Sequence, residues 1–195
     1  MTTPTSLRTP TASDPLGVML AYDHWATRRL LRLCEPLSRD ELHRGFPIGP
    51  GSLHDTLTHI IGCVRRWSDR IDEAPVRPSI ERAPSWFTEA TDHHDRTVAE
   101  LTRLADEAAA GIAAVATRAR ERGLAGVIHV TLESPSGPET YPFTRAAALM
   151  HAATHGTHHR AQCLNMLRHL NHPGVSDNLP DFDITDWQYE TECLA

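Results

Sequence analysis

The sequence predicts an all-α fold, a four-helix bundle with a small β-hairpin or extended loop between its third and fourth long helices. Three observations lead to this expectation. Four segments carry apolar residues at helical spacing over several turns. The connections between them contain most of the stop signals, chiefly proline and glycine. One short stretch, 127–143, instead has the β-branched and aromatic content of strands.

The first helix is predicted to begin at Asp14-Pro15, which combines an N-cap side chain with proline at the first helical position. Its apolar pattern continues to the stop at Pro36. Ser38 and Glu41 then have the spacing of a capping box, which predicts a short turn of helix.

The second helix is expected to begin at Ser52 and to end before Pro75. Residues 74–84 contain three prolines and form a connector. The third helix is predicted over 85–122, because its second half is rich in alanine and Gly123 follows it. The apolar stripe of the second helix consists of Leu53, Leu57, Ile60, Ile61, Val64, Trp67 and Ile71.

The fourth helix is predicted over 144–170, after the hairpin or extended loop. At 195 residues the chain has room for one domain with a full core. The expected organisation is a disordered lead-in over 1–13, the bundle over 14–172, and an acidic tail over 173–195 that docks in part.

Composition excludes several classes of function. A net charge of −6 argues against nucleic acid as a general partner. The N-terminus lacks the apolar segment of a secretory signal, and no apolar run reaches the roughly 18 residues of a membrane span. The four cysteines are widely spaced without a CxxC pair, which favours a reducing cytoplasm. A small molecule is the expected partner.

Histidines are concentrated in the fourth predicted helix. Six of the 13 histidines of the chain fall between His151 and His172. His155 and His159 are four residues apart, so a helix places both on one face, one turn apart. Two imidazoles in this arrangement can bind one transition metal ion. The alternative is a pair of histidines satisfied by ordinary hydrogen bonds at the edge of the bundle.

A helical projection separates these histidines from one another. His159 falls within the apolar stripe and His155 on its flank, whereas His158 points toward solvent or a subunit contact. His151, one turn before His155, is a marginal candidate. The apolar stripe itself contains Ala152, Gly156, Cys163, Met166 and Leu170.

A catalytic metal site needs a third protein ligand. The second helix offers His54 and His59, both at the edges of its apolar stripe, and periodicity does not choose between them. The chain has no Glu-x-x-His motif, which counts against a ferritin-like di-iron site. It has no His-Glu-x-x-His motif either, which counts against a zincin protease.

Three segments together resemble the DinB/YfiT-like superfamily over about residues 14–170. They are Tyr22–Leu31 with its Trp-Ala pair, Ser52–Ile60 followed by Trp67, and the His-x-x-x-His-Arg-Ala-Gln sequence of 155–162. The chain has Ala161 where glycine is common in the family, a change that suits a helix and should not affect the ligands.

The resemblance implies an up-down-down-up bundle and a metal site in which His59 joins His155 and His159. It also implies zinc or nickel as the metal, and a homodimer. Characterised relatives include transferases that use low-molecular-weight thiols and a thiol-dependent isomerase. The resemblance therefore points to a metal-dependent thiol S-transferase.

Three neutral imidazoles leave the charge of the metal uncompensated, so a coordinated water or thiol would lose its proton and act as the nucleophile. Arg160 is a candidate substrate contact, with a salt bridge to a neighbouring helix or chain as the alternative. Gln162 is a candidate for holding a ligand in place, with a bundle hydrogen bond as the alternative. A metal-dependent hydrolase and a non-catalytic, stress-related binding protein are the competing functions.

Overall fold

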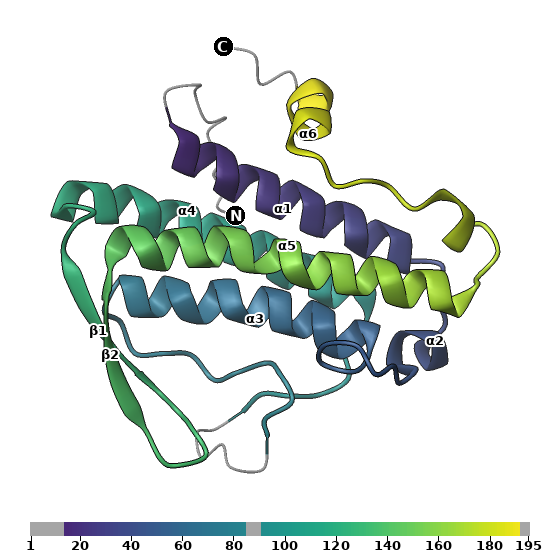
Figure 1. Cartoon of the computed structure of the whole chain (residues 1–195), viewed down its shortest axis with the longest axis horizontal. Coiled ribbons are helices and arrows are strands. Elements are labelled where there is room, and N and C mark those ends of the chain that lie inside the picture. Colours follow the sequence, from purple (N-terminus) through teal and green to yellow (C-terminus); the bar gives the residue numbers. More distant parts are fainter. Residues whose placement is uncertain (1–13, 85–90, 192–195) are drawn as a thin grey trace, which may run out of the picture.

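The computed structural model describes residues 14–84 and 91–191. These residues are mostly helical, with one two-stranded antiparallel sheet, as the sequence predicts (Figure 1). The lead-in predicted over 1–13 lies outside the described residues. The helices are α1 (Pro15–Cys34), α2 (Arg39–His43), α3 (Leu53–Ile71), α4 (Val98–Arg122), α5 (Arg145–Leu170) and α6 (Ile184–Thr191), with a short 3-10 helix η1 (Ser176–Asn178).

The four long helices pack side by side. Both α1 and α3 contact α4 and α5. Figure 1 shows α1 and α5 running in one direction and α3 and α4 in the other. As a result, α3 and α5 are antiparallel neighbours with a long shared interface. The apolar core fills the space between the four helices.

Side-chain caps explain where most helices begin. Asp14 Oδ1 accepts a hydrogen bond of 3.0 Å from the Gly17 backbone N–H, and Pro15 follows the cap. Ser38 and Glu41 form the predicted capping box at α2. Ser52 caps α3 in the same way as Asp14 caps α1.

The start of α4 differs from the prediction. The third long helix was expected from residue 85, but residues 91–97 are not helical and α4 begins at Val98; residues 85–90 lie outside the described part. A capping box between Thr97 and Glu100 fixes the helix start. The segment before it is held by other contacts, including hydrogen bonds from the Arg96 guanidinium to Asp92.

The predicted hairpin is formed by β1 (Val127–Leu132) and β2 (Glu139–Thr144), so the extended-loop alternative is wrong. Ile128 and Val130 on β1 are buried in the core. Phe143 meets Trp67 of α3 edge to face, with ring centroids 5.6 Å apart. These contacts anchor a sheet that two strands alone would not stabilise.

The tail returns to pack on α1. Trp187 of α6 is 4% exposed and packs in a cluster with Tyr22. The Tyr22 hydroxyl donates a hydrogen bond of 2.5 Å to the Phe182 carbonyl, and Arg29 forms an ion pair with Glu190. The α1 face opposite the core is therefore covered by the tail. None of the helices in the described part of the chain combines the length and the apolarity that a membrane crossing requires.

Candidate metal centre

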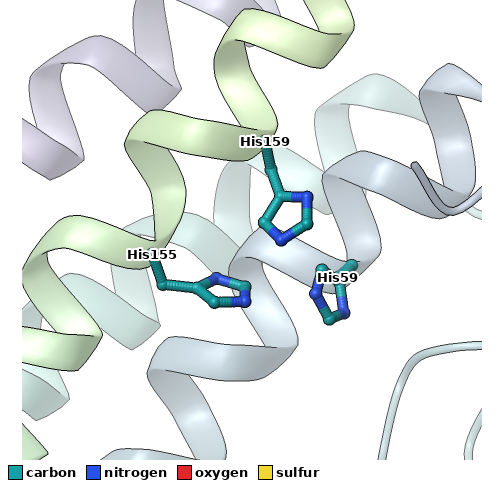
Figure 2. A group of neighbouring side chains, drawn as sticks. All are labelled: His59, His155 and His159. Carbon is teal, nitrogen blue, oxygen red and sulfur yellow. The ribbon is translucent and has the colours of Figure 1, made fainter. Parts of the chain in front are cut away.

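Three histidine side chains meet at the interface of α3 and α5. His59 comes from α3, and His155 and His159 come from successive turns of α5 (Figure 2). The ring centroid of His59 is 4.7 Å from that of His155 and 4.4 Å from that of His159. The rings of His155 and His159 are 4.4 Å apart. One ligand atom from each residue lies within 4.8 Å of the others, close enough for a single ion.

Of the two α3 histidines that periodicity left open, His59 lies with the α5 pair and His54 does not. His54 is 1% exposed. Its Nε2 accepts a hydrogen bond of 3.1 Å from the Arg96 backbone N–H, and its ring stacks on His43 with centroids 4.3 Å apart. His54 thus holds the segment before α4 in place.

The Glu81 carboxylate fixes the orientation of His59. Its Oε2 lies 2.9 Å from His59 Nδ1, and its Oε1 accepts a hydrogen bond from Arg66. Burial alone would raise the pKa of Glu81. The hydrogen bond from His59 and the charge of Arg66 together outweigh burial, so the pKa of Glu81 is below its usual range. An ionised carboxylate only accepts, so Nδ1 of His59 carries a proton and Nε2 is the nitrogen left to face a metal ion.

Gln162 does the same for His159. The Gln162 Oε1 accepts a hydrogen bond of 2.8 Å from His159 Nδ1, which again leaves Nε2 with a lone pair. The Gln162 amide donates to Nε2 of His158, an exposed residue, at 3.0 Å. The backbone of Gly49 packs directly against the Gln162 amide, since a Cβ at Gly49 would lie 2.2 Å from Gln162 Oε1.

His155 is the least satisfied of the three histidines. Its Nδ1 is buried and has no hydrogen-bond partner among the described residues. Burial, together with the charges of His59 and His159, lowers the pKa of His155 to about 3. Burial also lowers the pKa of His159. Both rings are therefore neutral at physiological pH, the form that a metal ion binds.

These features fit a transition metal. Two rings have their Nδ1 protons held by Glu81 and Gln162, and the third has an unsatisfied buried nitrogen. Three neutral nitrogen donors are the set found in catalytic zinc sites, where a fourth position remains for water or substrate. His59, His155 and His159 would hold the ion.

Replacing Glu81 by alanine is expected to lower the metal affinity by about 10- to 100-fold, because His59 loses the partner that fixes its ring. Glu81→Gln should restore part of the affinity, since an amide oxygen also accepts from Nδ1. The measurement is a competition titration against a chromophoric chelator. Glu107→Ala, which removes an exposed ion pair with Arg103, is the matched control. Equal affinities of the Glu81→Ala and Glu107→Ala variants would contradict this role.

The metal-free protein is expected to lose stability in acid. In the unfolded chain His155 titrates at its ordinary value of 6.5, but in the fold its pKa is about 3. Between these values the unfolded chain binds more protons, so the free energy of unfolding falls as the pH drops through this window. One proton contributes at most about 1.4 kcal/mol per pH unit. Urea unfolding across the window tests this, and His155→Asn should show a shallower dependence.

Arg160 lies on another face of α5 from His155 and His159. It is 1% exposed and forms an ion pair with Asp23 of α1, with 2.5 Å between Nη1 and Oδ1. The same guanidinium donates to Thr27 at 3.1 Å and to Thr157 at 3.2 Å. Of the two predicted roles for Arg160, the structure shows the salt bridge to a neighbouring helix.

Gly156 makes room for this ion pair. A Cβ at Gly156 would lie 2.4 Å from Asp23 Oδ1 and 2.5 Å from Arg160 Nη1. We expect Gly156→Ala to destabilise the fold by about 1–3 kcal/mol, although alanine is the better helix former. Gly111→Ala in α4 is the matched control, because a Cβ there meets nothing within 4 Å, and it should stabilise by about 1 kcal/mol. Urea unfolding of both variants checks the pair; a stabilising Gly156→Ala would refute the packing argument.

The sequence-based reasoning missed Glu81. It lies in the proline-rich connector, where no periodicity marks a single acidic residue as a partner of His59. It also missed a contact of 3.8 Å between Cys63 Sγ and His151 Nε2 beside the three histidines.

The search of curated proteins finds no match to the chain. The scan against protein-family models matches one model, described as the DinB family, over residues 6–191. The match covers nearly all of the chain, including the histidines of α3 and α5. The protein therefore belongs to the DinB family.

Proposed function

We propose that the protein is a divalent-metal-dependent enzyme that transfers a low-molecular-weight thiol to an electrophilic small molecule. The observation that carries this proposal is the convergence of His59, His155 and His159 on one point, half-buried between α3 and α5. The four long helices would then be the up-down-down-up bundle implied by the family resemblance.

The donor set determines the chemistry. When bound, a divalent ion held by three neutral imidazoles supplies a Lewis acid that lowers the pKa of a coordinated thiol or water. None of the three ligands is a carboxylate or a thiolate, so none offsets the charge of the ion. Such a site favours an anionic ligand in its remaining position.

The residues around the three histidines support metal binding and the use of an external thiolate as the anionic ligand. Glu81 and Gln162 hold His59 and His159 with their Nε2 lone pairs available. Cys63 lies one turn along α3 from His59, and burial raises the pKa of its thiol to about 12. Because this thiol stays protonated at neutral pH, a free small thiol is the better source of a sulfur nucleophile.

Zinc or nickel is the metal we propose, since both accept imidazole ligands. We place the protein in the cytoplasm, where small thiols are abundant and Cys34, Cys63 and Cys163 would persist as the free cysteines of the described part of the chain. We also propose that the protein is a homodimer.

The test supplies zinc- or nickel-loaded protein with an aryl halide electrophile such as chlorodinitrobenzene, with and without cysteine or glutathione. The proposal expects conjugate formation that requires both the thiol and the metal, and that is lost in His159→Ala. Turnover of an activated ester without a thiol would instead favour a hydrolase. Metal binding with no turnover across a panel of thiols and electrophiles would favour a binding protein.

A further inference from the structure

The α3 and α5 interface carries a longer row of donors than the three histidines. Cys63 follows His59 by one turn of α3, and His151 precedes His155 by one turn of α5. Because the two helices are antiparallel neighbours, these two residues meet one turn along the interface. They form a second group with His155, which both groups share.

The second group meets the same distance limit as the first. Cys63 Sγ lies 3.8 Å from His151 Nε2, and the rings of His151 and His155 are 5.3 Å apart. One donor atom of each residue lies within 4.8 Å of the others.

The surroundings favour a bound ion over a hydrogen-bonded cluster. A thiol is a weak donor and a weak acceptor, so the Cys63 contact satisfies His151 poorly. The buried Nδ1 of His155 has no partner among the described residues. Cys63 is 3% exposed, whereas His151 is exposed, which leaves an open side for an ion to enter. Trp67 packs against the His151 ring at 4.9 Å and limits its movement.

We propose that Cys63, His151 and His155 form a second metal site, selective for soft, thiol-binding metal ions. One thiolate and two imidazoles suit Cu⁺ and Cd²⁺ better than harder ions, because sulfur is a soft ligand. Coordination replaces the thiol proton, which is released to solvent, with a sulfur–metal bond. Burial raises the pKa of free Cys63 to about 12, so the thiol stays protonated until such an ion binds.

Because His155 belongs to both groups, the two sites cannot be filled independently. An ion bound by Cys63 and His151 takes His155 away from His59 and His159. A soft metal ion would therefore weaken binding at the three-histidine site, so the second site competes with the first. This inference goes beyond the proposed activity and does not require it.

The test is a titration of the full-length, metal-free protein with Cd²⁺, followed by the ultraviolet charge-transfer band that a thiolate ligand gives. We expect one saturable band in the wild type that is absent in Cys63→Ser and formed at much higher Cd²⁺ in His151→Ala. His59→Ala should retain the band, because it disrupts only the three-histidine site. Prior addition of Cd²⁺ should also weaken subsequent Zn²⁺ binding in the wild type but not in Cys63→Ser.

The chain contains a fourth cysteine, Cys193, outside the described residues, so Cys193→Ser is the matched control and should leave the band unchanged. His151 is exposed, so its replacement keeps the test valid even if Cys63→Ser unfolds. The proposal is overturned if the wild type gives no band, if Cys193→Ser abolishes it, or if His151→Ala leaves the Cd²⁺ dependence unchanged. Failure of the three-histidine site would appear separately, as unchanged Zn²⁺ binding in His59→Ala.

Discussion

Replacing His155 by alanine is expected to lower metal affinity more than about 100-fold, the upper end of the loss seen when a residue that only holds a ligand is removed. His155 contacts both of its partner histidines, and its buried Nδ1 has no hydrogen-bond partner among the described residues that would compete with a metal ion. Its loss leaves two imidazoles, which bind a metal loosely. The same variant should lose thiol conjugation.

His158→Ala is the control for this prediction. His158 is exposed on the same helix, and its Nε2 accepts a hydrogen bond from the Gln162 amide nitrogen. Competition titration with zinc and with nickel measures both variants. If His155→Ala and His158→Ala bind metal equally well, His155 is not a ligand and the site must be reassigned.

Removing the buried carboxylate of Asp23 is expected to be the most destabilising single change, at about 3–5 kcal/mol. Burial raises the pKa of Asp23, and the Arg160 guanidinium beside it opposes the shift. The energetic cost of burying this pair is therefore high. Asp23→Ala would leave Arg160, which is 1% exposed, without its charged partner.

A double-mutant cycle measures how much of each loss comes from the interaction between Asp23 and Arg160. Replacing both residues, Asp23→Leu with Arg160→Met, should recover much of the stability that either single change loses, because no unpaired charge remains. Arg28→Ala, in a half-exposed pair with Asp106, should lose at most about 1 kcal/mol. The free energy of unfolding of each variant is measured by urea unfolding. If the loss in the double variant equals the sum of the two single losses, the two charges do not stabilise each other.

The helices could be predicted because their signals are local. Caps at Asp14, Ser38 and Ser52 each act within three residues of the helix start, so they are readable from the sequence and are present in the structure. The late start of α4 was missed, although Thr97 and Glu100 carry the same signal. There the tertiary contacts of the preceding segment, including Arg96 with His54, override the helical continuation that was assumed.

The candidate site was predictable only in part, because only some of its residues are linked by local spacing in the sequence. The spacing of His155 and His159 places them on one face of a helix, which needs no knowledge of the rest of the fold. The choice of His59 over His54 required the family resemblance, because both lie at the edge of one stripe. Glu81 becomes a neighbour of His59, and Cys63 of His151, only when α3, α5 and the connector are packed together.

The most direct test of the account is the metal content of purified protein, measured for the wild type and for His59→Ala and His159→Ala after equal exposure to zinc or nickel. Circular dichroism should show that all three are folded. We predict about one tightly held ion per wild-type chain after dialysis against a weak chelator, and loss of that ion from both variants. Retention of the ion at wild-type levels in both variants would contradict the three-histidine site.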